Sequence, residues 1–282
     1  MPKQQLLNID GNAKTVKGQK QGYMTAVLYL QPSSKLCPSA SKGCLKACLN
    51  TAGRGGLSRV QDARRKKTQY FMTDRQGFMF QLDDEILKFI NKASKKGLIP
   101  VVRLNGTSDI DWTTIEIKRK ILRHGMFGGF KGKYTTHENI FEAFPGVQFY
   151  DYTKRLDVLR QSKLIPNYHL TFSRNESNQS DCFDAIQMGF NVAVVYSKDA
   201  LKQLKHLVQG WLTDSEGFID GDAHDLRFLN LPALTFPHHR SKTENLSSLG
   251  RIIMLSAKGK ARKDQSGFAV QAKLSGRLTG KA

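Results

Sequence analysis

Seven short apolar runs alternate along the chain with longer polar or amphipathic segments. The runs are rich in β-branched and aromatic residues, and polar or glycine-containing turns follow them. They are Met24–Leu30, Ile99–Leu104, Val147–Tyr150, Tyr168–Phe172, Asn191–Tyr196, Phe218–Ile219 and Arg251–Leu255. Runs of this length and composition predict β-strands, and their alternation with helices predicts a parallel sheet in an α/β domain.

The clearest helix signals lie between the first two predicted strands. A basic helix is predicted from about Ser58 to Tyr70, and Asp74 is the predicted N-cap of a second helix that ends at Gly97. The second helix has apolar residues at helical spacing, which are Phe78, Leu82, Ile86, Phe89 and Ile90. A further helix is predicted near Thr114–Arg123.

The predicted strands are apolar in their bodies and polar at their C-terminal ends, where α/β barrels carry their chemistry. We therefore expect an α/β fold with a full or partial (β/α) barrel of parallel strands. A doubly wound open sheet is the alternative. The expected organisation is an irregular basic arm at residues 1–22, a single barrel-like domain at 23–262 and a basic, glycine-rich tail at 263–282.

The formal net charge of +20 is concentrated at the two ends of the chain. Residues 1–70 hold thirteen Lys/Arg and two acidic residues, and residues 251–282 hold eight and one. Two basic ends favour a polyanion-binding surface if they meet in the fold, and solvated, unpartnered ends are the alternative. No apolar run reaches the ~18 residues that a membrane span needs, so we expect a cytoplasmic protein without a membrane partner.

Three of the four cysteines, Cys37, Cys44 and Cys48, fall within twelve positions after the first predicted strand. Clustered thiols in a reducing compartment indicate metal ligands rather than disulfides. Their spacing lacks the paired Cys-x2-Cys of common structural zinc sites. Three thiolates can hold three irons of a four-iron cluster and leave the fourth iron open to a ligand. Zinc stays an alternative, with a fourth ligand from Cys182, a histidine or water, although Cys182 is predicted to be a buried helix residue.

Polar residues at the predicted strand ends form a second group of candidates. If the strand ends converge, these residues line a pocket around the cysteine loop. They are Gly106, Thr107, Ser108 and Asp109 after the second strand, Lys154 after the third, Arg174 and Glu176 after the fourth, and Asp222 and His224 after the sixth. The segment Asp220–Asp225 also has the hard oxygen ligands that a divalent cation prefers, although Asp-Gly-Asp is also a plain turn.

Seven segments together carry a resemblance over most of the chain. They are Pro32–Ser34, Cys37–Cys48, Thr51–Gly55, Arg103–Ile110, Phe149–Lys154, His169–Arg174 and Asp220–Asp225. Through them the chain, from about Asn12 to Gly267, resembles an uncharacterised family of bacteriophage and prophage proteins. The resemblance implies a phage-encoded protein in the host cytoplasm and implies no particular activity.

In layout, the chain also resembles the radical S-adenosylmethionine enzymes. Those enzymes carry a three-cysteine loop after the first strand of a partial barrel, although their usual spacing is Cys-x3-Cys-x2-Cys and this chain has x6 and x3. The resemblance implies an iron–sulfur cluster on Cys37, Cys44 and Cys48 that binds S-adenosylmethionine. It also implies that the segment Gly106–Asp109 helps to hold this cofactor.

Two hypotheses follow. The first is an iron–sulfur enzyme, radical S-adenosylmethionine-like, acting on a nucleic acid or nucleotide that the basic ends bring in. In it, five residues are candidates for holding substrate or moving protons, namely Lys154, Arg174, Glu176, Asp222 and His224. The second is a zinc-stabilised basic protein that binds DNA or RNA in phage replication. A variant of the second is a metal-dependent nuclease that uses Asp220, Asp222 and His224.

Overall fold

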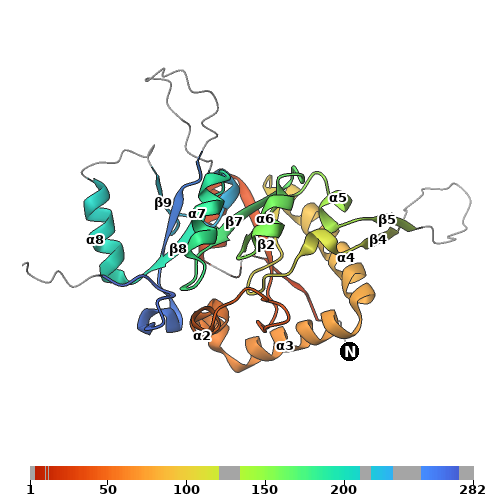
Figure 1. Cartoon of the computed structure of the whole chain (residues 1–282). Coiled ribbons are helices and arrows are strands. Elements are labelled where there is room, and N and C mark those ends of the chain that lie inside the picture. Colours follow the sequence, from red (N-terminus) through yellow and green to blue (C-terminus); the bar gives the residue numbers. More distant parts are fainter. Residues whose placement is uncertain are drawn as a thin grey trace, which may run out of the picture.

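A mostly parallel sheet of eight strands lies at the centre of the protein (Figure 1). The computed structural model describes residues 4–9, 11, 13–120, 134–209, 217–230 and 249–272. The strands of the sheet are β1 (Leu7–Ile9), β2 (Tyr23–Leu28), β3 (Ile99–Arg103), β6 (Gln148–Thr153), β7 (Tyr168–Ser173), β8 (Val192–Tyr196), β9 (Phe218–Asp220) and β10 (Ile252–Ser256). All seven strands predicted from the sequence are present, and β1 is additional.

The strands lie in the order β1-β2-β3-β6-β7-β8-β10-β9. Only β1 and β2 pair antiparallel, and every other neighbouring pair is parallel. From β2 to β8 the spatial order follows the chain, without the central reversal that a doubly wound sheet has. Among the described strands, β1 and β9 form open edges, so the expectation of a full barrel is wrong, whereas the α/β class with a mainly parallel sheet is confirmed.

Eight α-helices of the described part lie around the sheet. They are α1 (Ala13–Lys17), α2 (Lys42–Ala47), α3 (Ser58–Thr73), α4 (Arg75–Ser94), α5 (Ile140–Ala143), α6 (Leu156–Ser162), α7 (Gln179–Gln187) and α8 (Lys198–Gln209). Contacts of α4 with β3, α6 with β7 and α7 with β8 form the main apolar core. No helix among the described residues has the length and apolar character that crossing a membrane requires.

The N-cap, the buried face and the final turn of α4 all follow from its sequence. Asp74 is its N-cap, because its carboxylate accepts a hydrogen bond from the Gly77 N–H at 2.8 Å. Four of the predicted apolar positions are buried in the core, and they are Phe78, Leu82, Ile86 and Phe89. Burying each such side chain contributes about 1.5–3 kcal/mol. The following turn contains Gly97 at φ 65°, a left-handed conformation that glycine adopts without steric cost.

The opposite face of the sheet, called the inner face here, carries Val101 and Tyr150. These two residues pack with Leu226 in a second apolar cluster, which Tyr23 and Phe228 extend. Leu226 and Phe228 belong to the segment 221–230, which includes the 3-10 helix η5 (Arg227–Leu229) and contacts β6 and β7. The inner face is therefore covered by this segment, and by η1 (Gly18–Gln21) near β2.

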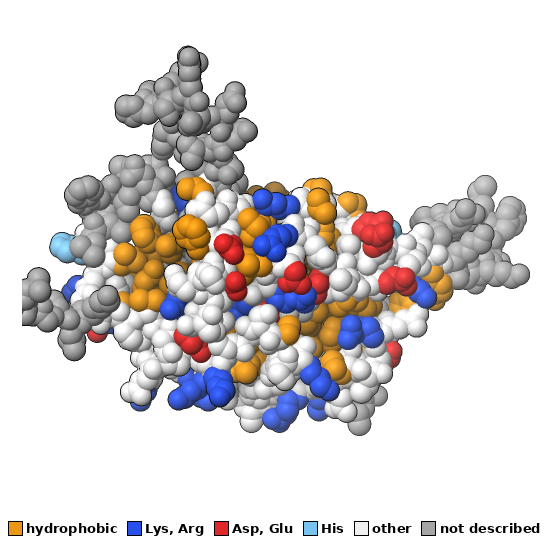
Figure 2. Space-filling model, viewed as in Figure 1, with side chains coloured by type: hydrophobic (Ala, Val, Ile, Leu, Met, Phe, Trp, Pro, Cys, Tyr) orange, Lys and Arg blue, Asp and Glu red, His pale blue; other side chains and the backbone are white. Residues whose placement is uncertain are grey.

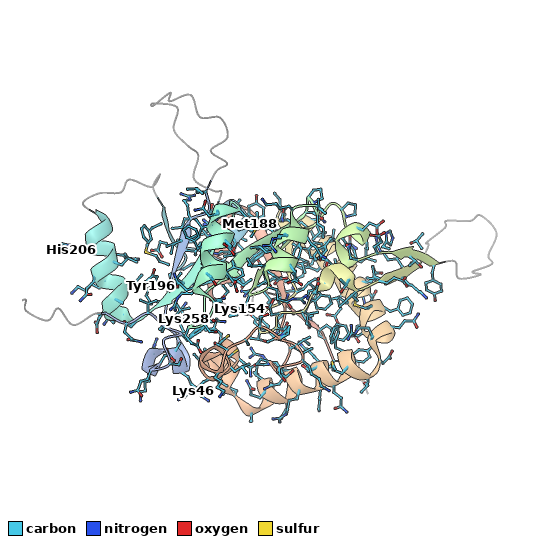
Figure 3. All side chains as sticks on the ribbon, in the orientation of Figure 1. Lys46, Lys154, Met188, Tyr196, His206 and Lys258 are labelled. Atoms are coloured by element: carbon cyan, nitrogen blue, oxygen red, sulfur yellow. The ribbon has the colours of Figure 1, made fainter. Side chains whose placement is uncertain are left out.

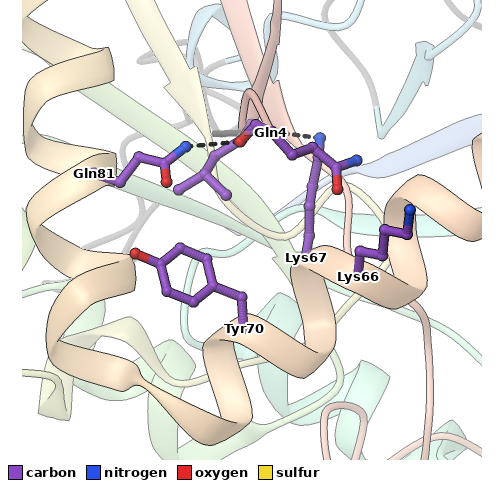
Figure 4. A pocket seen from close by; sticks show the side chains of 6 residues that line it. Gln4, Lys66, Lys67, Tyr70 and Gln81 are labelled. Carbon is purple, nitrogen blue, oxygen red and sulfur yellow. Dashed lines mark hydrogen bonds between the residues drawn. The ribbon is translucent and has the colours of Figure 1, made fainter. Parts of the chain in front are cut away.

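The first 22 residues are not the irregular arm that their composition predicts, because β1 and α1 lie within them. The Glu85 carboxylate accepts hydrogen bonds from the Leu6 and Leu7 N–H groups at 2.8–2.9 Å. Lys67 donates to the Leu6 carbonyl at 2.7 Å and to Asn8 (Figure 4). These partners come from α3 and α4, far along the chain, and Figure 4 shows the surface pocket of about 260 Å³ beside them.

Two other predictions need correction. The helix expected near Thr114–Arg123 is instead the 3-10 helix η4 (Trp112–Thr114) and strand β4 (Ile117–Lys120), which pairs with β5 (Tyr134–His137). Ile115, Glu116, Ile117 and Lys118 alternate apolar and polar residues, which is the period of a strand. The expected tail begins inside the 3-10 helix η6 (Gly259–Lys263), and its Val270 bridges to Tyr196 of β8. Residues 273–282 lie outside the described part.

Candidate functional site

The cysteine loop leaves β2 and lies at the edge where the parallel strands end, next to α2 and α3 (Figure 1). Cys37 is buried, Cys44 lies within α2 and Cys48 is the C-cap of α2; all four cysteines of the chain are free thiols. Ser41 caps α2 by accepting a hydrogen bond from the Cys44 N–H at 3.0 Å. The Cys48 sulfur accepts one from the Asn50 N–H at 3.5 Å. A short capped helix thus fixes the spacing of the three thiols.

Lys154 follows β6 and lies between the sheet and α2 (Figure 3). Its ammonium donates a hydrogen bond to the Ser173 hydroxyl at 3.0 Å and lies close to the Cys44 thiol. Burial alone would lower the pKa of Lys154, but Cys44, Asp109 and Cys37 together raise it above its ordinary value. The ammonium is therefore charged at neutral pH, and it lies beside the predicted metal-ligating cysteines.

Two of the three thiols have raised pKa values. Burial raises the pKa of Cys37 to about 11, and it also raises the pKa of Cys48, while the Lys154 charge partly opposes both shifts. Both thiols are thus protonated at neutral pH without a further cation. A bound metal supplies that cation and deprotonates its cysteine ligands, so the low polarity around the thiols does not prevent coordination.

The loop after β3 is fastened against the cysteine loop. The Gly106 N–H donates to the Leu28 carbonyl at 3.0 Å, and a Cβ at Gly106 would lie 2.7 Å from that oxygen, so only glycine fits. The Thr107 hydroxyl donates to the Leu30 carbonyl at 2.6 Å. The Thr107 carbonyl is 4.0 Å from the Cys37 sulfur. Residues predicted to hold a cofactor therefore adjoin the predicted metal ligands.

The next two residues of this loop are held by internal hydrogen bonds. The Ser108 hydroxyl donates to the Asn105 side chain at 2.9 Å. The Asp109 N–H donates to the Leu36 carbonyl at 2.8 Å, and the Asp109 carboxylate accepts from the Lys154 N–H at 3.0 Å. Burial raises the pKa of Asp109, and the Lys154 charge opposes that shift. Asp109 thus joins the chain after β3 to the chain after β6, next to Cys37.

Asp151 in β6 organises the same loop. Its carboxylate accepts hydrogen bonds from the Asn105 N–H at 2.7 Å and the Leu104 N–H at 3.2 Å. It is completely buried. Burial raises the pKa of Asp151 to about 7, although the Arg103 charge and the two N–H groups act in the opposite direction.

This raised pKa predicts a pH-dependent stability. The folded protein keeps a proton on Asp151 that the unfolded chain releases near pH 4, so the free energy of unfolding should fall as pH rises from about 4 to about 7. His169, with its pKa lowered to about 4 by burial, acts with the opposite sign below pH 6.5. Urea unfolding of Asp151→Asn should therefore be compared with wild type. The variant's relative stability should grow over that window and level off above it; a constant difference would contradict the raised pKa.

Arg174 and Glu176, which follow β7, hold neighbouring segments in place. The Glu176 carboxylate accepts hydrogen bonds from the Ser41 hydroxyl at 2.7 Å and from the Gly43 N–H at 2.8 Å, at the start of α2. The Arg174 guanidinium donates to the carbonyls of Gly267 and Phe268 at 2.9 and 3.0 Å. These two predicted residues therefore anchor the cysteine loop and the C-terminal segment to the end of β7.

We expect Glu176→Ala to loosen the cysteine loop. The change removes two hydrogen bonds to a carboxylate, each with a contribution of about 1.5–3 kcal/mol, from the first turn of α2. Cys44, which is half-buried, should then react faster with a thiol reagent. Glu142→Ala is the control, because that carboxylate accepts from the Glu138 N–H far from the cysteines. Equal labelling rates in wild type and Glu176→Ala would show that the contact does not hold the loop.

The acidic segment after β9 is bound by lysines. The Asp222 carboxylate lies 2.6 Å from the Lys14 ammonium and 3.4 Å from that of Lys258. Burial alone would raise the pKa of Asp222, but hydrogen bonds from Lys14 and Ser256 bring it well below its ordinary range. The His224 ring accepts a hydrogen bond from the Leu226 N–H at 3.2 Å. Neither Asp222 nor His224 contacts the cysteine loop in the described part of the chain.

Asp220 is paired as well, with the Lys205 ammonium 2.8 Å from its carboxylate. Among the described residues, no group of three or more His, Cys, Asp and Glu side chains is arranged to hold a single metal ion. The thiolates that ligate a four-iron cluster bind different irons and so need not converge on one point.

Sequence reasoning missed several arginines that are central to the structure. Arg64 of α3 is buried, donates to the Asn50 carbonyl and side chain at 2.5 and 2.7 Å, and lies over the Tyr29 ring. Arg227 is buried at the inner face, and the Arg103 side chain there is 12% exposed. Their signal in the sequence is a charge inside an apolar run, as in Val101-Val-Arg-Leu104 and Leu226-Arg-Phe228.

Comparison with known proteins gives a family over nearly the whole chain. The family described as Gene product 88 matches residues 5–272, a range that contains the cysteine loop and the loops after β3, β6 and β7. No curated protein and no solved structure matches the chain. The match agrees with the resemblance to bacteriophage and prophage proteins seen in the sequence. The chain therefore belongs to the Gene product 88 family, a phage-type family.

Proposed function

We propose that the protein is an iron–sulfur enzyme, radical S-adenosylmethionine-like, built on a partial (β/α) barrel. The carrying observation is the grouping of three thiols around one partly buried ammonium, that of Lys154, at the C-terminal edge of the parallel sheet. The strand order from β2 to β8, which follows the chain, supports the partial barrel. The position of the cysteine loop after the first parallel strand supports the likeness in layout.

The residues present fit such a cluster. Cys37, Cys44 and Cys48 would each ligate one iron, while Cys182 lies in α7 with its sulfur 3.6 Å from the Asn178 side chain. This donor set leaves one iron open. When bound, a reduced cluster of this kind supplies an electron that cleaves S-adenosylmethionine.

The chain's own residues would surround this centre. Thr107 lies beside Cys37, and the segment Gly106–Asp109 would hold the cofactor's polar end. Lys154 would hold positive charge beside the thiolates and stabilise them. Glu176 and Arg174 would position the cysteine loop and the C-terminal segment around the proposed cluster.

Anaerobic purification tests the proposal. We expect about four iron and four sulfide per chain, and 5′-deoxyadenosine when a reductant and S-adenosylmethionine are added. One zinc per chain and no iron would contradict the iron–sulfur enzyme proposal and support the alternative, a zinc-stabilised nucleic-acid-binding protein. Absence of any metal after anaerobic reconstitution would overturn both.

A second observation favours a polyanionic partner, a nucleic acid. Exposed basic side chains surround the cysteine loop on α2, on α3 and on η6, and blue side chains gather along that edge in Figure 2. They are Lys42, Lys46, Arg59, Arg65, Lys66, Lys260, Arg262 and Lys263. Contacts between α2 and η6 bring the two basic ends of the chain together. We propose that this basic face holds nucleic acid across the cysteine centre.

Reversing charges on the basic face tests whether nucleic acid binds there or responds only to the overall positive charge of the protein. The double variant Lys46→Glu/Arg262→Glu should weaken DNA or RNA binding and reduce the slope of log K against log salt by about two. Lys92→Glu/Lys96→Glu on and after α4 is the matched control, since both lysines are exposed there. Fluorescence anisotropy at several salt concentrations measures both. Equal weakening by the two double variants would mean that binding is not localised to the basic face.

A further inference from the structure

A layer of charged and polar side chains crosses the middle of the inner face. It contains Arg103 of β3, Tyr152 of β6, and His169 and Thr171 of β7. The alternation of side chains along each strand directs these residues to the same face as Val101 and Tyr150. Arg227 of η5 lies over this layer, where its charge acts on both His169 and Tyr152.

Several polar atoms of this layer have no hydrogen-bond partner among the described residues. They are the Arg103 Nε, the His169 Nε2 and the Thr171 hydroxyl, all of them buried. The Arg103 Nε is 3.9 Å from the Asp151 carboxylate, beyond hydrogen-bond distance. Unpaired buried polar atoms are costly, and three of them on neighbouring strands indicate a further bonding partner beyond the described residues.

The charges of the layer do not balance. Arg103 is paired with Asp225, whose carboxylate is 3.0 Å from its Nη1. Arg227 is completely buried, yet among the described residues its guanidinium hydrogen-bonds only to neutral groups, which are the carbonyls of Gly221, His224 and Asp225 and the Asn230 side chain. A buried cation without a carboxylate partner is unfavourable, and a bound anion would compensate it.

We propose that this layer binds an oxyanion, the carboxylate or phosphate group of a small-molecule substrate. The Arg103 Nε–H is unfilled in the planar fork that suits such groups, and His169 and Thr171 add neutral donors beside it. A water molecule would form hydrogen bonds with the unpaired polar atoms, but, unlike an anion, it would leave the charge of Arg227 uncompensated. The segment 221–230 covers the layer, which restricts the occupant to a small group.

The position of the layer relates it to the cysteine centre. His169, Thr171 and Ser173 alternate along one face of β7, and Ser173 is hydrogen-bonded to Lys154. Thr171 and His169 thus lie about 7 and 13 Å along the strand from the group that faces the cysteines. An anion held there would anchor one end of a substrate whose other end reaches the strand edge. This inference goes beyond the proposed cluster and does not depend on it.

Orthophosphate and malonate are the probes, added to the full-length protein at fixed ionic strength. We expect a saturable rise of the unfolding temperature with at least one of them. His169→Gln and Thr171→Val should each raise the dissociation constant about tenfold, because each loses a hydrogen bond to a charged group. His206→Gln, on exposed α8, is the control.

Two results would overturn the anion site. One is the absence of saturable stabilisation by both probes, and the other is stabilisation that His169→Gln and Thr171→Val leave unchanged. Lys46→Glu/Arg262→Glu should not alter the dissociation constant, which separates the layer from the basic face. Iron content is measured on the same samples. Loss of iron with an intact anion response would reject the cluster alone, and the reverse would reject the anion site alone.

Discussion

Replacing Cys44 by serine is expected to remove the bound iron while the fold remains. Cys44 is half-buried within α2, and serine conserves its size, so the capped turn from Ser41 should persist. The pKa of a serine hydroxyl is much higher than that of a cysteine thiol. Serine therefore forms the anionic ligand far less readily and is a poor replacement for a cysteine ligand. We expect the iron content of anaerobically purified protein to fall from about four per chain to a small fraction.

Cys182 provides a matched control for this experiment. It is also buried, its pKa is raised to about 11 by burial, and its sulfur lies 3.6 Å from the Asn178 side chain in α7. Cys182→Ser should keep the iron and sulfide content of wild type, with circular dichroism as the test of folding in both variants. Iron retained in Cys44→Ser would remove the basis of the cluster proposal. Iron lost equally in both variants would point to a cluster held elsewhere or to damaged folding.

The strands could be predicted because each is a compact apolar run ending in turn residues, and this local pattern survives in the fold. Strand β1 could not, because three residues carry no period and the strand depends on Glu85 and Lys67 from helices far along the chain. The segment around Ile117 has a period of two, which is the pattern of the strand that the fold contains there. Closure of the sheet is set by how its edges meet, which no local pattern contains.

The candidate site likewise has parts that the local sequence predicts and parts that depend on contacts far along the chain. The cysteine loop, Gly106–Asp109 and Lys154 lie next to one another, because the ends of adjacent parallel strands meet at one edge. Asp222 follows a strand end too, but two lysines bind it, and Lys14 comes from more than 200 positions away. Ion pairs at such sequence separation leave no spacing signal. For the same reason the inner-face pairing of Arg103 with Asp225 is visible only in the fold.

This inner-face pair predicts the largest loss of stability from a single conservative change. The Asp225 carboxylate is buried, 3.0 Å from the Arg103 Nη1 and 3.3 Å from the Tyr150 hydroxyl. Asp225→Asn keeps the shape and removes the charge, so Arg103 loses its paired carboxylate. Breaking a buried pair in this way costs about 3–5 kcal/mol, a large part of the 5–15 kcal/mol typical for a domain.

Asp157→Asn is the control, because Asp157 pairs with Arg155 at 2.6 Å but is 63% exposed. An exposed pair contributes about 0–1 kcal/mol, so the urea midpoint should shift strongly in Asp225→Asn and little in Asp157→Asn. The anion site adds a second expectation, since Asp225→Asn raises the positive charge of the layer. Orthophosphate should restore more stability to this variant than to wild type. Equal midpoint shifts for the two variants would show that the buried charges are compensated by groups other than Asp225.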